Sequence, residues 1–411
     1  MILVDNILGL FLNIKTYKKN ASGLFDYCSK EIKEINTFIE NTTFLTRKDN
    51  QYLRLDKQSD LESRKGEELL FYIRKNKSEE VFTFENPVPT KNITFNLDNI
   101  NNLNNKIYYV LNSNNPNISC QNDDYYLCQD DIIRMGNVKL IVKEIHLKNE
   151  KELDEAGIVN LIKYDINSLN RNSGPIFNFC PQIKKYTLYS EDSQNKKIKC
   201  NFCNKNECDK DNPLINFCSC NNYFHFLCLK DRINRKTMLK QNTNKSINSY
   251  YIKGEVSCKK CNLNYPLKFQ IEGIEKLYEF LSIDTPKEYN YLILESIENK
   301  LYYGSMRFIF VIKLNEKVIK IGRGTENDIV ICDPSISNKH AEIKYEKGKI
   351  IIKNISGKFG TSILVKKAIK LNNNIITLQV GRSVIQVKQM KYGEFQKLEL
   401  NNKHYPLSKK D

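Results

Sequence analysis

The centre of the chain concentrates the residue types that bind metal ions. The 411-residue sequence has thirteen cysteines, and eight of them lie between Cys200 and Cys261, with His225 among them. Seven of these cysteines and His225 form four close pairs, spaced Cys-x2-Cys, Cys-x-Cys, His-x2-Cys and Cys-x2-Cys. Zn²⁺ takes four such ligands in a tetrahedron, so eight ligands predict two zinc ions. The candidate ligands are Cys200, Cys203, Cys218, Cys220, His225, Cys228, Cys258 and Cys261.

Energetics favour the same interpretation. Residues 200–261 are rich in Asn and Lys, and so short a segment buries too little apolar surface to be stable alone. A structural zinc ion contributes on the order of 10 kcal/mol to folding. The odd number of cysteines, without a secretion signal, indicates thiolate chemistry in a reducing compartment and not a disulfide framework.

The order of these ligands resembles the RING-CH family over residues 198–268, with NPLINFCSC, HFLCLKD and SYYIKGEVSCKKCNLNYP around them. The resemblance implies a cross-braced fold in which Cys200, Cys203, His225 and Cys228 share one ion. The second ion is then held by Cys218, Cys220, Cys258 and Cys261. It also implies a ubiquitin ligase that recruits a ubiquitin-conjugating enzyme, with structural metals and no catalytic side chain.

Three features depart from that family. The gap from Cys220 to His225 is short, Cys208 is an additional thiol, and Arg232 occupies the place of a common Trp. The short gap also suits a PHD finger, which usually has an aromatic residue two positions before its last cysteine pair. Here that residue is Val256. We therefore expect RING-CH rather than PHD.

A second group of residues has the chemistry to bind phosphate. Arg323 lies between Gly322 and Gly324 in GRGTENDIVICDPSISNKHAEI, and Ser337 follows fourteen residues later. A guanidinium can donate to two phosphate oxygens, and a serine hydroxyl adds a neutral donor. Asn338 is placed to contact the backbone of a bound peptide. Lys358, in NISGKFGT, adds positive charge.

These motifs resemble the forkhead-associated (FHA) domain over residues 289–389. The resemblance implies a β-sandwich that binds phosphothreonine peptides, with Arg323, Ser337, Asn338 and Lys358 at the peptide. It gives structural roles to Gly322, His340, Gly360 and Thr361. Phe359 replaces an Asn that is usual in the family. A fold-only domain without a ligand is the alternative.

The elements that must position these residues are mostly short strands. Residues 291–389 alternate in short β-type runs between Gly and Asn turns, which is typical of a sandwich. YYLCQDDIIRMGNVKLIVKEIH predicts three strands of a β-meander, which resembles the closing strands of the same sandwich and is interpreted as a degenerate second copy. Helical spacing predicts short helices over 152–166 and 272–281. The apolar N-terminal segment is expected to pack as a strand or helix.

The predicted fold class is multidomain α+β: a β-rich N-terminal region, a small two-zinc cross-brace and a C-terminal all-β sandwich. The predicted parts are a mixed region 1–80, a β-rich region 81–190 with a short helix, the zinc domain 198–268, the FHA domain 289–389 and a tail 390–411.

Composition limits the partners. The net charge is +16, but Lys is spread along the whole chain beside Asn, Ile and Tyr, so nucleic acid is not the expected partner. No window of 18 apolar residues predicts a membrane span. We expect a soluble intracellular protein, cytoplasmic or nuclear, that binds a phosphothreonine-containing protein. Its expected activity is that of a RING-type ubiquitin ligase; the alternatives are a phospho-dependent scaffold without catalysis and a PHD-like chromatin reader.

Overall fold

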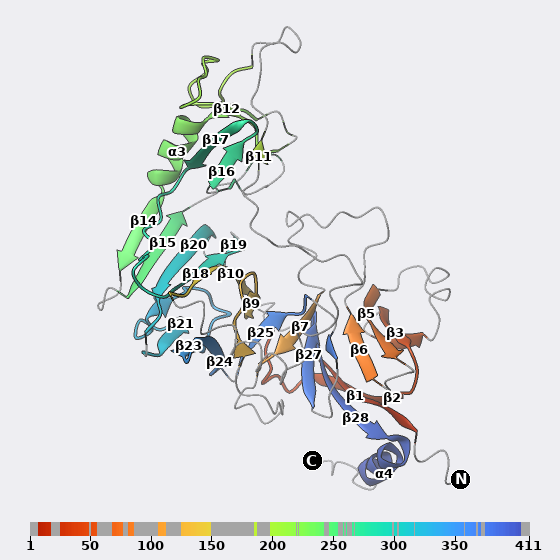
Figure 1. Cartoon of the computed structure of the whole chain (residues 1–411). Helices are drawn as coiled ribbons and strands as arrows, with labels where there is room; N and C mark the ends of the chain where they lie inside the picture. The colour runs from red at the N-terminus through yellow and green to blue at the C-terminus, as the bar shows by residue number, and fades with distance from the viewer. Residues whose placement is uncertain are drawn as a thin grey trace.

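The computed structural model is built almost entirely of β-strands (Figure 1). The residues that it describes are 7–17, 25–48, 51–55, 68–76, 81–85, 106–111, 125–148, 185–186, 198–241 except 219 and 221, 246–253, 258, 260, 265–297 except 267, 300–301, 304–356 except 316, 358–366, 369–370 and 375–403.

Ten strands lie between residues 8 and 146 in the described part of the chain. They are β1 (Leu8–Tyr17), β2 (Ile32–Ile39), β3 (Thr43–Lys48), β4 (Gln51–Leu55), β5 (Glu68–Asn76), β6 (Val81–Glu85), β7 (Ile107–Val110), β8 (Tyr125–Tyr126), β9 (Ile132–Met135) and β10 (Val138–His146). The apolar N-terminal segment thus forms a strand, β1, whose side chains are mostly buried.

The cysteine-rich segment adds one helix and short strands. They are β11 (Lys185–Tyr186), β12 (Leu214–Ile215), β13 (Phe224–His225), α3 (Phe226–Asn234), β14 (Thr237–Gln241), β15 (Ile247–Lys253), β16 (Lys268–Ile271) and β17 (Ile274–Glu279).

The C-terminal part begins with β18 (Tyr291–Ser296), followed by β19 (Lys300–Leu301), β20 (Gly304–Lys313), β21 (Ile319–Gly322), β22 (Ile329–Val330), β23 (Ala341–Glu346), β24 (Lys349–Asn354), β25 (Thr361–Leu364), β26 (Ile369–Lys370), β27 (Ile376–Val380), β28 (Ser383–Lys391) and helix α4 (Tyr392–Lys403).

The two ends of the chain build two bodies of matching strand order. The largest sheet runs β14-β15-β20-β18-β10-β9-β25-β7-β27-β28-β1-β2. The two halves of this sheet have corresponding strand orders. From the middle outwards, one half is β25-β9-β10-β18-β20 and the other is β7-β27-β28-β1-β2. Two smaller sheets face this one and also match, β22-β21-β23-β24-β8 and β4-β3-β5-β6-β26.

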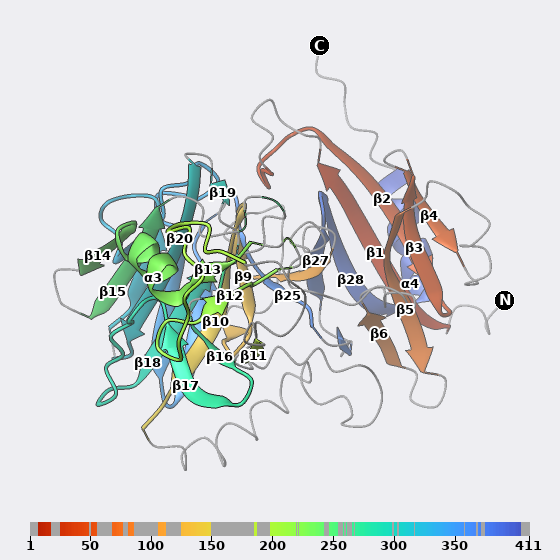
Figure 2. The same ribbon diagram turned by 90° about the horizontal axis from the view of Figure 1, so that it is seen from above.

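The closing strands of the two bodies are exchanged. Strands β8, β9 and β10 from the N-terminal part pair with β24, β25 and β18 of the C-terminal part. In return β26 pairs with β6, β27 with β7, and β28 with β1. Figure 2 shows yellow β9 and β10 beside β18, and blue β27 and β28 beside red β1. The bodies meet where β25 and β7 pair antiparallel.

The exchange joins both parts in one core. The largest cluster of buried apolar side chains includes Leu12 from β1, Ile133 from β9, Phe310 from β20 and Val387 from β28. Burial on this scale is the main stabilising contribution to folding. Among the residues described, the two parts therefore share their largest core.

The cysteine-rich segment attaches to the open edge of the C-terminal body. Strand β15 pairs antiparallel with β20, and β14 pairs with β15. Beneath them the buried Arg307 donates to the Glu295 carboxylate and, from Nη1, to the Tyr265 carbonyl at 2.9 Å. Arg307 thus connects the segment to β18 and β20.

Two predictions about elements need correction. Residues 272–281 are not a helix: the chain turns at Gly273, whose φ is +78°, and continues as β17. The side chains of Tyr278 and Phe280 are both buried against Phe269. Burial of every second residue is the pattern of a strand. The meander of residues 126–145 has the three predicted strands, but β8 joins a different sheet from β9 and β10. The predicted helix 152–166 lies outside the described residues. In the described part of the chain, neither helix is long and apolar enough to cross a membrane.

Candidate functional site

The structure brings Arg323 and Ser337 together at one end of the C-terminal body. The N–H of Arg323 donates to the Ser337 carbonyl at 2.9 Å, and its Nε donates to the Ile336 carbonyl at 3.2 Å. Arg323 is exposed and Ser337 half-buried. The backbone therefore holds a guanidinium and a hydroxyl on adjacent loops, which suits a doubly charged phosphate.

The neighbouring Asn327 fixes the spacing of these loops. Its Nδ2 donates to the carbonyls of Gly324 at 2.7 Å and Asn338 at 2.6 Å. A Cβ on Gly322 would collide with the Asn338 carbonyl, so the close approach requires glycine. Asn338 itself is exposed. The sequence analysis missed Asn327, which lies within the quoted motif.

His340 lies beneath the loops and is fully buried. Its Nδ1 accepts the Ser337 N–H at 3.0 Å and its Nε2 donates to the Gly360 carbonyl at 2.9 Å. Burial lowers the pKa of the ring to about 4, although the Gly360 carbonyl acts in the opposite direction. A neutral ring thus connects the loop of Ser337 to the loop of Gly360.

The last loop supplies a second hydroxyl. Ser356 Oγ lies 2.6 Å from Ser337 Oγ and accepts the Phe359 N–H at 3.2 Å. Thr361 Oγ1 donates to Asn354 Oδ1 at 2.9 Å and so closes this loop onto β24. Lys358 is exposed at its tip.

Residues of the distant N-terminal part border this loop. The Tyr27 N–H donates to the Lys358 carbonyl at 2.8 Å, and Lys358 Nζ lies 3.6 Å from Asp26 Oδ2. Gly360 has a φ of +65°, and a Cβ there would collide with the Tyr27 ring. The sequence analysis did not identify Asp26 or Tyr27, because no local pattern relates residues more than 330 positions apart.

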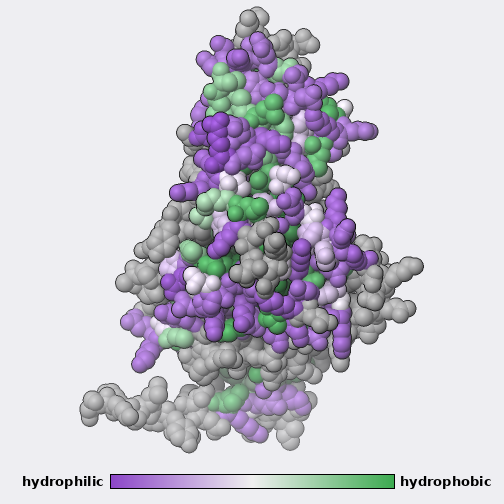
Figure 3. Space-filling view, turned by 90° about the vertical axis from the view of Figure 1, so that its left-hand side faces the viewer, coloured by the Kyte–Doolittle hydropathy of each residue, from purple (hydrophilic) through white to green (hydrophobic). Residues whose placement is uncertain are grey.

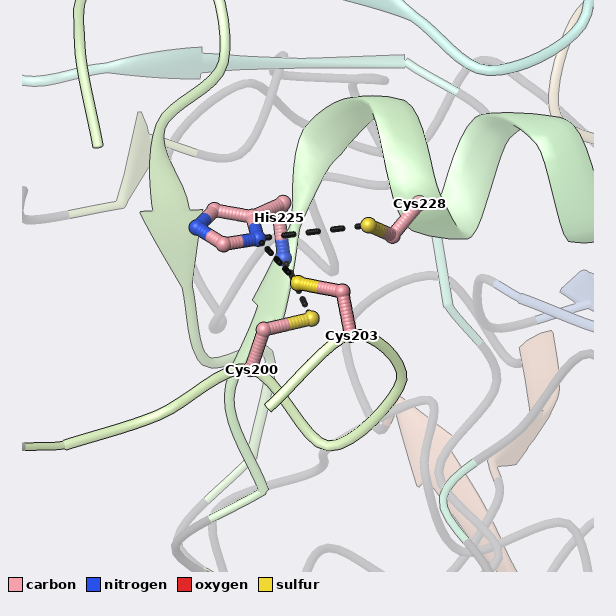
Figure 4. Close-up of side chains that lie close together, drawn as sticks. All are labelled: Cys200, Cys203, His225 and Cys228. Carbon is pink, nitrogen blue, oxygen red and sulfur yellow. Dashed lines mark hydrogen bonds between the residues drawn. The ribbon is translucent and has the colours of Figure 1, made fainter. Parts of the chain in front are cut away.

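The first predicted group of metal ligands is assembled around β13 and α3 (Figure 4). The ligand atoms of Cys200, Cys203, His225 and Cys228 all lie within 4.8 Å of one another. His225 Nδ1 is 3.1 Å from Cys203 Sγ and 3.9 Å from Cys228 Sγ. Its Nε2 lies 2.7 Å from the Glu207 carbonyl, which orients Nδ1 towards the sulfurs, as second contacts do in zinc sites.

The electrostatics of this cluster suit a divalent cation. Burial and the adjacent Cys200 thiol raise the pKa of Cys228 to about 12. Burial also opposes ionisation of Cys200, but N–H groups, including those of Phe202 and His225 at 3.4 Å, lower its pKa. Three thiolates so close together repel one another. A bound Zn²⁺ would remove that repulsion, so the donor set fits the metal.

The second predicted group is assembled in part. The ligand atoms of Cys218, Cys220 and Cys258 lie within 4.8 Å of one another, and Asn222 Nδ2 donates to Cys258 Sγ at 2.9 Å. Cys261 lies outside the described residues. Cys208 is exposed and belongs to neither group among the residues described.

Apolar side chains reach the surface beside the first cluster. Phe202 is 40 % exposed and Leu227, on α3, is 50 % exposed. The Arg232 guanidinium lies 4.9 Å from the centre of the Phe202 ring. Green apolar areas interrupt the polar surface over the cysteine-rich part, in the upper half of Figure 3.

The comparisons with known proteins identify one of these regions. A family model described as the FHA domain matches residues 319–384, from β21 into β28. The chain therefore contains an FHA domain, and the match includes Arg323, Ser337, His340 and Lys358. No RING-CH match was found over the cysteine-rich segment. No curated protein and no solved structure matches the chain.

Proposed function

We propose that the protein binds phosphothreonine-containing partners through its FHA domain. The observation that carries this proposal is the position of Arg323 beside Ser337, joined by a backbone hydrogen bond at the open end of the C-terminal body. Arg323 and Ser337 bind the phosphate, Asn338 contacts the peptide backbone, and Lys358 adds charge at the rim. His340, Gly322, Gly360 and Thr361 hold the loops in place.

Calorimetry on the full chain tests this function. A phosphothreonine peptide library is titrated against the same peptides unphosphorylated and with phosphoserine. A hydrogen bond to a charged group contributes roughly 1.5–3 kcal/mol. The variant Arg323→Ala lacks two such bonds, so we expect its affinity for the phosphothreonine peptides to fall by about a hundredfold or more. The variant Arg323→Lys should recover only part of this affinity, because an ammonium cannot donate two parallel hydrogen bonds as the planar guanidinium does.

The matched control is Arg235→Ala, which removes an exposed arginine that follows α3 and pairs with Asp231. This variant should bind as the unchanged chain does. Equal binding of phosphorylated and unphosphorylated peptides would contradict the proposal.

We further propose that the cysteine-rich segment binds two Zn²⁺ ions. Cys200, Cys203, His225 and Cys228 hold one, and Cys218, Cys220 and Cys258, with Cys261, hold the other. The metals supply structure, and the chain supplies no catalytic side chain there.

A RING-type ubiquitin ligase is the activity that this segment supports best. Phe202 and Leu227 offer exposed apolar contacts beside the first metal cluster, where a ubiquitin-conjugating enzyme could dock. The FHA domain would then select phosphorylated substrates for ubiquitin transfer.

A phospho-dependent scaffold is the second candidate, and Arg232 favours it. Its guanidinium lies over Phe202 and adds charge to the apolar surface. An autoubiquitination assay with a panel of conjugating enzymes separates the two. Ubiquitin chains that are lost in Cys258→Ser would support the ligase. If neither the unchanged chain nor Arg232→Trp forms ubiquitin chains, the result would support the scaffold.

A further inference from the structure

The phosphopeptide-binding end of the FHA domain includes a wall from the N-terminal part of the chain, residues 25–29. Tyr27 anchors this wall. It is almost completely buried, its N–H bonds the Lys358 carbonyl, and its hydroxyl donates to Gln379 Oε1 at 2.5 Å. Its ring packs edge-on against Phe25, with centroids 4.6 Å apart. Tyr27 therefore holds the wall through contacts that do not involve charge.

Asp26 is fixed within this wall and faces the binding loop. The Cys28 N–H donates to Asp26 Oδ1 at 2.8 Å, and the Ser29 N–H donates to the Asp26 carbonyl at 3.2 Å. The other carboxylate oxygen, Oδ2, lies 3.6 Å from Lys358 Nζ. The side chain of Asp26 is 19 % exposed and that of Lys358 is 57 % exposed. The carboxylate is thus the more rigidly held partner.

Lys358 lies on the same loop as Ser356, next to the groups assigned to phosphate in the sequence of that loop. It lies two residues after Ser356, whose hydroxyl is 2.6 Å from that of Ser337. Its ammonium has two possible anionic partners, the Asp26 carboxylate and a bound peptide. A carboxylate near the site also repels acidic side chains that flank a phosphothreonine.

We propose that Asp26 is a specificity-determining residue of the phosphopeptide site, which the two parts of the chain therefore build together. Asp26 holds Lys358 at the rim and reduces the positive charge available to the ligand. The site accordingly disfavours phosphothreonine peptides with acidic flanking residues and favours those with basic ones. This inference rests on the proposed phosphothreonine binding.

The strand exchange supports a shared site. The turn between β9 and β10 reaches the loop that carries Ser337, where the Asn137 N–H donates to Ser335 Oγ at 2.9 Å. Ser335 in turn donates to Asp333 Oδ1 at 2.5 Å. N-terminal residues thus contact two of the loops at the binding end.

The test uses the full chain and two sets of phosphothreonine peptides, with Asp/Glu or with Lys/Arg scanned through the flanking positions. Asp26→Asn keeps the size of the side chain and removes its charge. Affinity for the acidic peptides should rise about two- to five-fold, the scale of exposed charge pairs. The preference for basic peptides should fall. In the background Lys358→Gln, the Asp26→Asn change should have a smaller effect on acidic peptides.

The matched control is Glu31→Gln, the same charge change on an exposed residue nearby. If Asp26→Asn and Glu31→Gln change the peptide affinities equally, Asp26 acts only through long-range charge, and the inference is overturned. The inference would also be overturned if the unchanged chain binds the peptides and Asp26→Asn binds them with the same affinities. If neither the unchanged chain nor Asp26→Asn binds any phosphothreonine peptide, the proposed function fails, and this inference fails with it.

Discussion

At the scale of single residues, His340 connects the two loops that carry Ser337 and Gly360. It accepts the Ser337 N–H and donates to the Gly360 carbonyl, so its ring must carry one proton, on Nε2. Protonation of Nδ1 would replace that acceptor with a donor facing an N–H. The loops therefore depend on a neutral histidine.

This dependence predicts a loss of stability in acid. Burial lowers the pKa of His340 from 6.5 to about 4, so the folded protein binds fewer protons than the unfolded chain between those values. The stabilisation is present above pH 6.5 and is lost as the pH falls towards 4, by up to about 3 kcal/mol. We expect the Tm of the unchanged chain to fall more between pH 7.5 and 5 than that of His340→Gln.

The variant should be the less stable protein at pH 7.5, because two hydrogen bonds are disturbed. The proposed zinc sites are the same in both proteins, so the difference between the two curves reports His340. Parallel curves would contradict the assignment.

At the scale of elements, β13 and α3 carry two proposed zinc ligands that are close in sequence. His225 lies in β13, and Cys228 follows in the first turn of α3. One metal ion would therefore fix the angle at which the helix leaves the strand. The apolar contacts available to this region, around Phe226 and Phe269, cover the opposite side of α3.

We predict two zinc ions per chain by native mass spectrometry, and one in Cys203→Ser. The serine hydroxyl is a poor replacement for a thiolate, and the three remaining ligands leave the site incomplete. Cys208→Ser is the matched control, since Cys208 is exposed and outside both groups among the described residues. It should retain two ions. An unchanged chain with one ion or none would refute the two-site assignment.

Local pattern explains which elements could be predicted from the sequence. The ligand pairs and the phosphate motif depend on residues near one another, and β8, β9 and β10 all lie within the segment that was predicted to form three strands. The helix predicted over 272–281 was wrong because Ile274, Leu277, Tyr278 and Leu281 also fit helical spacing. Only packing against Phe269 selects the strand.

Pairing between distant strands has no such local signal. The hairpin of β27 and β28 has an apolar pattern that would suit either body, since both present the same kind of open edge. Its placement beside β1, and that of Tyr27 beside Gly360, depend on the tertiary fold. Asp26 consequently could not be identified from the motif around Lys358.

At the scale of the whole molecule, the exchange of closing strands makes the two bodies inseparable. We predict that a protease site inserted between Ser173 and Gly174 can be cut without releasing either piece. The pieces should stay together in size-exclusion chromatography in buffer, because β8–β10 and β26–β28 each complete the other body. They should separate only in denaturant.

The control is a second insertion after Lys403, the last residue of α4, which should release its short terminal peptide. Elution of the two large pieces as independent folded monomers in buffer would show that the closing strands return to their own bodies.

The pairing of β1 also has a consequence for synthesis on the ribosome. One of the two edges of this strand is covered by β28, which is synthesised more than 360 residues later. At about 5–20 residues per second, the nascent chain carries that open edge for tens of seconds. An uncovered apolar strand is a template for wrong pairing. Translation speed and chaperone supply should therefore affect the yield of this protein.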